Sequence, residues 1–210
     1  MATCVTTDNE SFIIDGKYLK SINQFYNKRK SYFQSVLPND KRYSKRLRLL
    51  DSKRNRVVED YLNKAVSTLI TKIKELNVDE VIIKKNEILK GKDRRKANQN
   101  FVSIPLSRFK DKIIFKCQQN GIKVTTINES YTSKASFYDN DKIEKGEYSG
   151  KRIHRGLYKR YNSNVLINAD VNAALNIYKK YILKCNSTDN KIDYLMSRGL
   201  TIPSRILITL

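Results

Sequence analysis

Hydrophobic and polar positions in the first third of the chain change from strand-like to helix-like spacing. Short β-prone runs at residues 4–7 and 11–14, separated by a polar turn, predict a β-hairpin. The polar, basic sequence from Lys17 to Arg56 is compatible with helix, and a break that begins at Pro38 divides it into a helical hairpin. Apolar side chains then recur at three- and four-residue spacing between Val57 and Leu76, which predicts a long core-packing helix.

Strand-like and helix-like segments alternate in the rest of the chain. The apolar run at residues 79–83 is typical of a strand that is covered on both faces. A helical stripe follows at residues 106–117, and residues 122–127 alternate as a strand should. Residues 168–181 predict an amphipathic helix with Asp170 at its first turn, on the apolar stripe. This order predicts an α/β fold with helices on the faces of a sheet.

These elements are expected to form one domain with two insertions and a tail. We assign residues 1–182 to the domain, with a helical insert at about residues 17–56 and a basic, glycine-punctuated ribbon at about residues 131–166. Residues 183–210 are assigned to a C-terminal tail, with a linker-like polar run at residues 185–190 and a last twenty residues that are expected to dock back on the domain. A flexible surface loop is the alternative interpretation of the ribbon.

A strong excess of positive charge narrows the classes of partner. The chain has 42 Lys and Arg against 21 Asp and Glu, a formal net charge of +21 and a pI near 9.9. DNA bound through its phosphates is therefore expected, and no apolar stretch approaches the length of a membrane span. A solvated surface is the alternative role for these charges. The residues expected to contact nucleic acid are Arg42, Lys45, Arg46, Arg48, Arg54, Arg94, Arg95, Lys151, Arg152, Arg155, Lys159 and Arg160.

Cysteine and histidine usage limits the chemistry. Cys4, Cys117 and Cys185 are isolated and odd in number, which favours a reducing, cytoplasmic setting and argues against disulfides or a structural zinc site. His154 is the only histidine. Any catalysis would therefore depend on carboxylates and hard cations.

Three sequence segments together resemble a known family. They are residues 98–105 (NQNFVSIP), 129–136 (ESYTSKAS) and 168–174 (NADVNAA), and they resemble the OrfB/TnpB proteins of bacterial insertion sequences. The resemblance implies a RuvC-like nuclease with a ribonuclease H-like fold, related to the compact type V CRISPR effectors. It further implies an RNA-guided DNA endonuclease, with DNA and guide RNA as partners in the bacterial cytoplasm, near the nucleoid. Asp170 then matches the last carboxylate of a Mg²⁺- or Mn²⁺-binding catalytic set.

Several positions depart from the family pattern. Relatives carry a strand with their first catalytic Asp just before the segment that matches residues 2–4, so we expect an N-terminally truncated member that is inactive alone. Lys stands at the end of the 79–83 strand where relatives have a catalytic Glu, and we expect Glu129 to replace it, with Glu87 as the alternative ligand. Ser136 and Asp139 stand at cysteine positions of the family's zinc ribbon, so no zinc is expected.

Simpler interpretations remain for each site residue, and three functions compete. Asn168 or Asp170 is suited to cap its helix, and Glu129 to be an exposed strand-end residue. The chain is then a truncated transposase fragment, a nucleic-acid-binding module without catalysis, or a working hydrolase that completes its site with Asp8, Asp15 or Glu87. The oligomeric state is left open.

Overall fold

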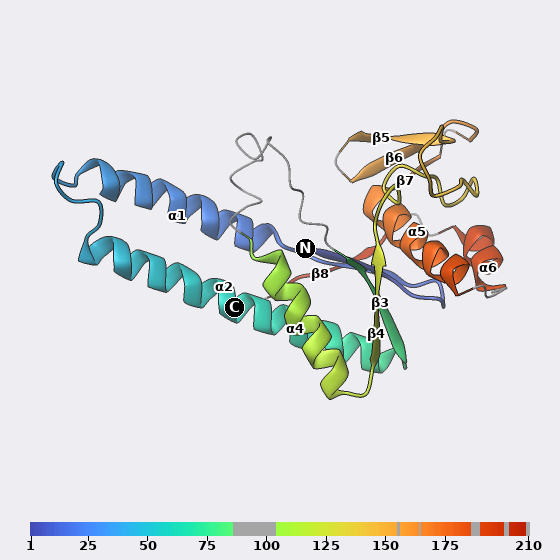
Figure 1. The fold of residues 1–210 in the computed structure, drawn as a ribbon, viewed down its shortest axis with the longest axis horizontal. Coiled ribbons are helices and arrows are strands. Elements are labelled where there is room, and N and C mark those ends of the chain that lie inside the picture. The colour runs from blue at the N-terminus through green and yellow to red at the C-terminus, as the bar shows by residue number, and fades with distance from the viewer. Residues whose placement is uncertain (86–103, 155, 164, 186–189, 200–201, 209–210) are drawn as a thin grey trace. The chain divides into compact units, whose positions relative to one another are not determined.

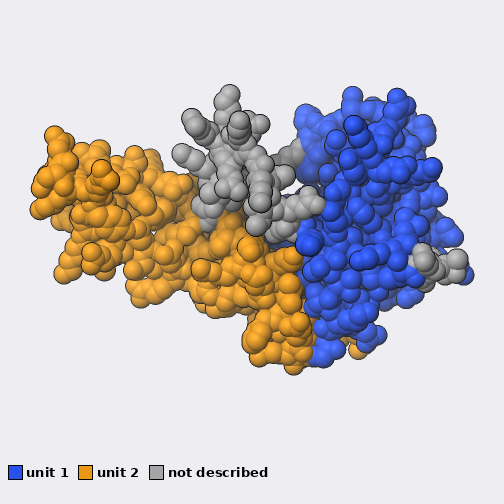
Figure 2. Space-filling view, viewed as in Figure 1, with its two compact units in different colours: residues 1–14, 79–88, 121–206 blue, residues 15–78, 89–120, 207–210 orange. Residues whose placement is uncertain are grey.

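A computed structural model describes the whole chain except residues 86–103, 155, 164, 186–189, 200–201 and 209–210. The described residues form five α-helices and eight short strands (Figure 1). They divide into two units, one of residues 1–14, 79–88 and 121–206 and the other of residues 15–78, 89–120 and 207–210 (Figure 2). The mixed α/β class predicted from the sequence is therefore confirmed.

The second unit is built on a hairpin of two long helices, α1 (Lys17–Ser35) and α2 (Lys45–Glu75) (Figure 1). α2 begins at Lys45 because the side chain of Ser44 accepts a hydrogen bond from the Leu47 N–H at 3.3 Å. The second arm of the hairpin and the long helix expected from Val57 are not separate elements, and they form one continuous helix. No Gly or Pro interrupts this stretch, so nothing in it stops the helix. α2 ends before Asn77, which has a left-handed φ of 48°.

Apolar and polar contacts both hold α1 against α2. Leu19 and Leu47 are fully buried. The Tyr26 hydroxyl donates to Asp51 at 2.6 Å, and Arg54 Nε donates to the buried Oδ1 of Asn23 at 2.9 Å. Because these bonds lie between the arms, they fix which sides of the two helices face each other and which face solvent.

The third helix of this unit, α4 (Leu106–Gln119), packs on α2. Phe109, Ile113 and Cys117 are buried, as the helical stripe predicts. Lys112 Nζ lies 2.6 Å from Glu59 Oε1 on α2, and this hydrogen bond lowers the pKa of Glu59. Cys117 is a core residue in this helix, and its burial raises the pKa of the thiol.

The first unit contains three small sheets. β1 (Ala2–Val5) and β2 (Ser11–Ile14) form the predicted antiparallel hairpin, and β8 (Ser204–Ile206) pairs parallel to β2. β3 (Glu80–Lys85) and β4 (Lys123–Asn128) form a separate parallel pair. The described strands thus do not join into one mixed sheet. The ribonuclease H-like topology stays a prediction.

The strand predicted at residues 79–83 is present as β3 but differs in its burial. Its first four residues are half-buried and its last two are exposed, so it is not covered on both faces as expected. β4 is its hydrogen-bonded neighbour among the described strands, and a two-stranded sheet has two open edges.

The third sheet lies in the segment predicted as an irregular ribbon. β5 (Gly150–His154), β6 (Leu157–Arg160) and β7 (Leu166–Asn168) pair antiparallel in sequence order. Gly150 is required where it stands, because a Cβ there would lie 2.5 Å from the carbonyl oxygen of Lys159. The ribbon is thus an ordered sheet in its second half.

Two helices complete the first unit. α5 (Ala169–Lys184) contributes Val171 and Leu175 to a core that also contains Phe137, and α6 (Lys191–Arg198) adds Leu195. α5 also contacts β1, β3 and β4. Because α6 packs in this core and β8 pairs with β2, the C-terminal tail docks back on the chain as predicted.

Candidate nucleic-acid interface

Asp170 lies in the first turn of α5, but it does not cap the helix. The side chain of Asn168 accepts hydrogen bonds from the backbone N–H groups of Asp170 and Val171, at 2.9 and 3.1 Å. Asn168 is therefore the N-cap. The Asp170 side chain is 51% exposed, and Arg152 on β5 donates to its Oδ1 at 3.1 Å. The Asp170 carboxylate therefore does not bind the backbone N–H groups at the start of α5 and instead forms an ion pair with Arg152.

Glu129 directly follows β4 and also has a cationic partner. Its Oε2 lies 2.8 Å from Lys84 Nζ on β3, the strand paired with β4. Lys84 stands in the stretch where the sequence resemblance implies a catalytic Glu, and the structure brings it beside Glu129, the residue expected to replace that Glu. The sequence did not indicate this pair, because the parallel strands that carry the two residues are far apart along the chain.

The described residues do not complete a metal site around these carboxylates. Carboxylate oxygens are the ligands that Mg²⁺ prefers. Among the residues that the structure describes, however, no three His, Cys, Asp or Glu side chains come together in a group that could hold a metal ion. Glu129 and Asp170 are each neutralised by a different basic side chain instead. Glu87, the alternative ligand, lies outside the described residues.

Two asparagines of the α5 motif hold the preceding motif in place. Asn172 Nδ2 donates to the carbonyl of Ala135 at 2.8 Å, and Asn172 Oδ1 accepts from the Phe137 N–H at 3.0 Å. Asn176 Nδ2 donates to the carbonyls of Thr132 and Ala135. Both asparagines are fully buried. Two of the three segments that carry the family resemblance, residues 129–136 and 168–174, are thus joined by buried hydrogen bonds of α5, which gives the asparagines a structural role.

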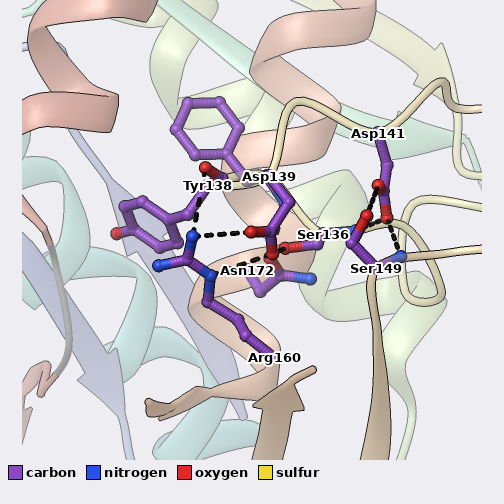
Figure 3. A network of polar contacts seen from close by, with 8 residues as sticks. Ser136, Tyr138, Asp139, Asp141, Ser149, Arg160 and Asn172 are labelled. Carbon is purple, nitrogen blue, oxygen red and sulfur yellow. Dashed lines mark hydrogen bonds and ion pairs between the residues drawn. The ribbon is translucent and has the colours of Figure 1, made fainter. Parts of the chain in front are cut away.

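Ser136 and Asp139, at the cysteine positions of the family's ribbon, take part in a polar network with β6 (Figure 3). Arg160 donates to Asp139 from Nε at 2.9 Å and from Nη2 at 2.6 Å, and Ser136 Oγ donates to Asp139 at 2.5 Å. The bond from Arg160 lowers the pKa of Asp139, whose side chain is only 7% exposed. An ion pair of this kind fixes the loop to the sheet.

A second carboxylate extends this network (Figure 3). Asp141 accepts from the Ser136 N–H at 2.7 Å, from the Ser149 N–H at 3.0 Å and from Ser149 Oγ at 2.6 Å. The network ties residues 136–141 to the strands that follow. Whether the ribbon binds zinc is not tested, and the expectation that it does not stays a prediction.

The basic residues proposed for the ribbon differ in their surroundings. Lys151 and Arg152 are exposed on β5, and Lys159 is half-buried on β6. Arg160 is engaged by Asp139, so it has a structural partner and is the weakest candidate for a phosphate contact. Arg155, like Arg94 and Arg95, lies outside the described residues.

The basic residues proposed for the helical hairpin are mostly exposed. Arg42 lies before α2, and Lys45, Arg46 and Arg48 lie in its first turns with their side chains toward solvent. Arg54 is half-buried and stands over the Tyr26 ring, with 5.6 Å from its Cζ to the ring centroid. The structure thus places the proposed hairpin residues on α2 or just before it.

The sequence did not indicate which aromatic residues of the hairpin reach solvent. Phe25 and Tyr32 on α1 are 64% and 59% exposed, whereas Tyr26 is half-buried and bonded to Asp51. Arg29 lies beside the exposed face, 6.0 Å from the Phe25 ring centroid and 5.3 Å from that of Phe33. Phe25 and Tyr32 are seven residues apart, which places them on one face of α1, and this spacing is the signal that could have identified the exposed face.

The hairpin therefore has the features of a nucleic-acid-binding surface, with clustered positive charge and exposed aromatic rings. Within the part of the chain that the structure describes, no helix is long and apolar enough to cross a membrane.

Two families match parts of this chain. Residues 1–89 match the family model OrfB IS605, described as a probable transposase. Residues 107–177 match the model of the Cas12f1-like TNB domain. Both matches support a likeness to the TnpB-like family that the sequence motifs resemble, and neither concerns the catalytic state of the chain.

A search of solved structures finds similarity to the cryo-EM structure of a Cas12f1–sgRNA–target DNA complex. The identity is 22% and the TM-score is 0.48, over 73% of this chain and 40% of that chain. This chain thus spans less than half the length of the Cas12f1 chain it matches. No protein with a curated description matches it.

Proposed function

We propose that this chain is a nucleic-acid-binding part of an OrfB/TnpB-type transposase, which holds DNA and a guide RNA through their phosphates. The observation that carries the proposal is the α1–α2 hairpin. Lys17 to Arg56 contains only two acidic residues, Asp40 and Asp51, among its many Lys and Arg side chains. The matches to a probable transposase over residues 1–89 and to a Cas12f1-like TNB domain over residues 107–177 support the same function.

The described residues fit best with a chain that, by itself, binds nucleic acid without cleaving it. Two carboxylates that each have a basic partner do not hold a divalent cation as they stand. Base pairing with a guide RNA would supply sequence choice, and the protein would supply contacts to the backbone.

A nuclease site at Asp170 and Glu129 is the second candidate. It is favoured by the exposure of both carboxylates and by the packing of α5, which carries Asp170, against β4, which ends before Glu129. Mg²⁺ or Mn²⁺ would be the metal, and a RuvC-like catalytic set would need at least one further ligand.

One experiment separates the two functions. Labelled single-stranded and duplex DNA are incubated with the chain, with and without Mg²⁺ or Mn²⁺, beside the Asp170→Ala variant. We expect both proteins to bind and neither to cut, with binding by the variant unchanged or slightly tighter because a negative charge near the phosphates is lost. Metal-dependent cleavage that disappears in Asp170→Ala would contradict binding alone and establish the nuclease. Absence of binding by the parent chain at low salt would contradict the proposed function itself.

A further inference from the structure

The exposed side of α1 carries a stripe of aromatic rings. Tyr18, Phe25 and Tyr32 follow one another at seven-residue spacing, which is close to two helical turns, so they lie on one face. Their exposed fractions are 45%, 64% and 59%. The opposite side of the helix is used for packing, through the buried Leu19 and Asn23. A stripe of large exposed rings on one helix face is typical of a binding surface.

The charge around this stripe is positive. α1 contains Lys17, Lys20, Lys28, Arg29 and Lys30 and has no Asp or Glu in its sequence. Among the described residues, no carboxylate forms an ion pair with Arg29, whose guanidinium lies between the rings of Phe25 and Phe33. A second copy of this chain, with its net charge of +21, would be repelled by such a surface. A polyanion is the partner that the charge favours.

We propose that Phe25 and Tyr32 form a stacking surface for unpaired bases of a single-stranded nucleic acid, with Lys28 and Arg29 contacting its phosphates. This inference rests on the proposed function and narrows it to a single-stranded segment. Bases in a duplex are stacked on each other and cannot stack on a side chain, whereas unpaired bases can. The two rings are about 10.5 Å apart along the helix axis. That length corresponds to about three stacked nucleotides at about 3.4 Å each.

The absence of tryptophan from the chain allows a direct test of stacking. Phe25→Trp would place a single indole on the stripe of the full chain. Phe115→Trp is the matched control, because Phe115 is also an exposed aromatic residue, 58% exposed, but lies on α4. The probes are oligo(dT) and oligo(rU) of about 16 nucleotides, long enough for one binding site.

We expect the bound single strand, oligo(dT) or oligo(rU), to quench the indole fluorescence of Phe25→Trp. The same strand should leave the fluorescence of Phe115→Trp unchanged. Quenching by one of the two strands, RNA or DNA, supports the inference and identifies the type of strand. Quenching by neither strand at saturating binding would overturn it.

Alanine variants provide the matching affinity measurement. Phe25→Ala and Tyr32→Ala should each weaken binding of the single strands roughly 5- to 100-fold and leave duplex affinity and the salt slope unchanged, because the phosphate contacts remain. Phe115→Ala should bind as the parent does, and circular dichroism melting checks that all three variants are folded. Equal loss of single-strand and duplex binding, or no loss, would overturn the inference.

Two outcomes distinguish this inference from the proposed function. If the parent chain binds in a salt-dependent way and Phe25→Ala has no effect, the stacking surface is overturned and the proposed function stands. No binding by the parent chain removes both. A dimer of the parent chain in sedimentation equilibrium that Phe25→Ala dissociates would assign the stripe to a second copy and would overturn the inference.

Discussion

Individual buried side chains hold together the segments that carry the family resemblance. Asn172 satisfies a backbone carbonyl and a backbone N–H of the Ala135–Phe137 stretch at once. A buried backbone group that loses its partner costs free energy, and the Phe137 N–H has Asn172 as its partner, whereas the Ala135 carbonyl also accepts from Asn176. The motif on α5 is therefore a stability element as much as a candidate site.

Replacing Asn172 should reveal this role. Asn172→Ala leaves the Phe137 N–H without its partner and the Ala135 carbonyl with the Asn176 amide alone, so we expect the free energy of unfolding to fall by about 1–3 kcal/mol. Urea unfolding followed by circular dichroism measures it. Asn162→Ala, at an exposed position, is the control and should change stability by less than about 0.5 kcal/mol. A change of that small size in Asn172→Ala would contradict the structural role.

The Asp139–Arg160 pair predicts a dependence of stability on pH. The pKa of Asp139 is lowered below its ordinary value of 3.8, chiefly by the bond from Arg160. A carboxyl whose folded pKa is lowered contributes stability above its unfolded pKa, and this contribution is lost as the pH falls through the folded pKa. The stabilisation should thus be complete near neutral pH and decline in acid.

Asp139→Asn should remove this contribution. We expect it to lower the free energy of unfolding by about 2–3 kcal/mol near neutral pH, because Arg160 keeps no charged acceptor there, and to flatten the acid decline. Urea unfolding at a series of pH values measures both effects. Asp40→Asn, at an exposed turn position, should keep the parent's acid decline. If the two variants behave alike, the pair does not stabilise the ribbon.

At the scale of elements, local signals predicted most helices and strands. The β1–β2 hairpin, α4 and α5 follow from alternation, helical spacing and capping residues that lie within each segment. α2 was divided in two because its first half is basic and its second half apolar, yet a change of composition does not end a helix. The strands of the ribbon were missed because they are short, three to five residues each, and do not alternate clearly between apolar and polar residues. Their pairing with each other and the network around Asp139 hold them in place.

The ion pairs of the candidate site could not be predicted from the sequence. Lys84 meets Glu129 only because β3 and β4 pair in parallel register, and Arg152 meets Asp170 only because β5 lies near the start of α5. Both pairs depend on tertiary structure. Exposed ion pairs of this kind add little to the free energy of unfolding. Their main effect is to neutralise the carboxylates of Glu129 and Asp170.

The α1–α2 hairpin should supply phosphate contacts that can be counted. Removing Arg46 and Arg48 together, as Arg46→Ala with Arg48→Ala, should weaken binding of all nucleic acids alike. It should also make the slope of log K against log salt less negative by about 1 for each residue that contacts a phosphate. Fluorescence anisotropy across a potassium chloride series measures the slope. Lys74→Ala, at the far end of the same helix, is the control. An unchanged slope in the double variant would place the phosphates elsewhere.

At the scale of the whole molecule, positive charge is the property that the sequence and the α1–α2 hairpin share. A net charge of +21 in 210 residues attracts polyanions over a distance set by the ionic strength. Sequence-independent affinity of this kind is what the proposed function requires, because there base pairing with a guide RNA would supply the specificity. The two units each carry exposed basic side chains, on α2 in one and on β5 in the other.

The salt dependence of binding by the unmodified chain tests this account most directly. Anisotropy of a labelled single-stranded oligonucleotide is measured against the chain at increasing potassium chloride without divalent metal. We predict tight binding at low salt and a steep linear fall of log K with log salt, with a slope of about −0.7 for each phosphate neutralised. Binding that is absent at low salt, or that does not change with salt, would contradict the claim that this chain is a nucleic-acid-binding protein.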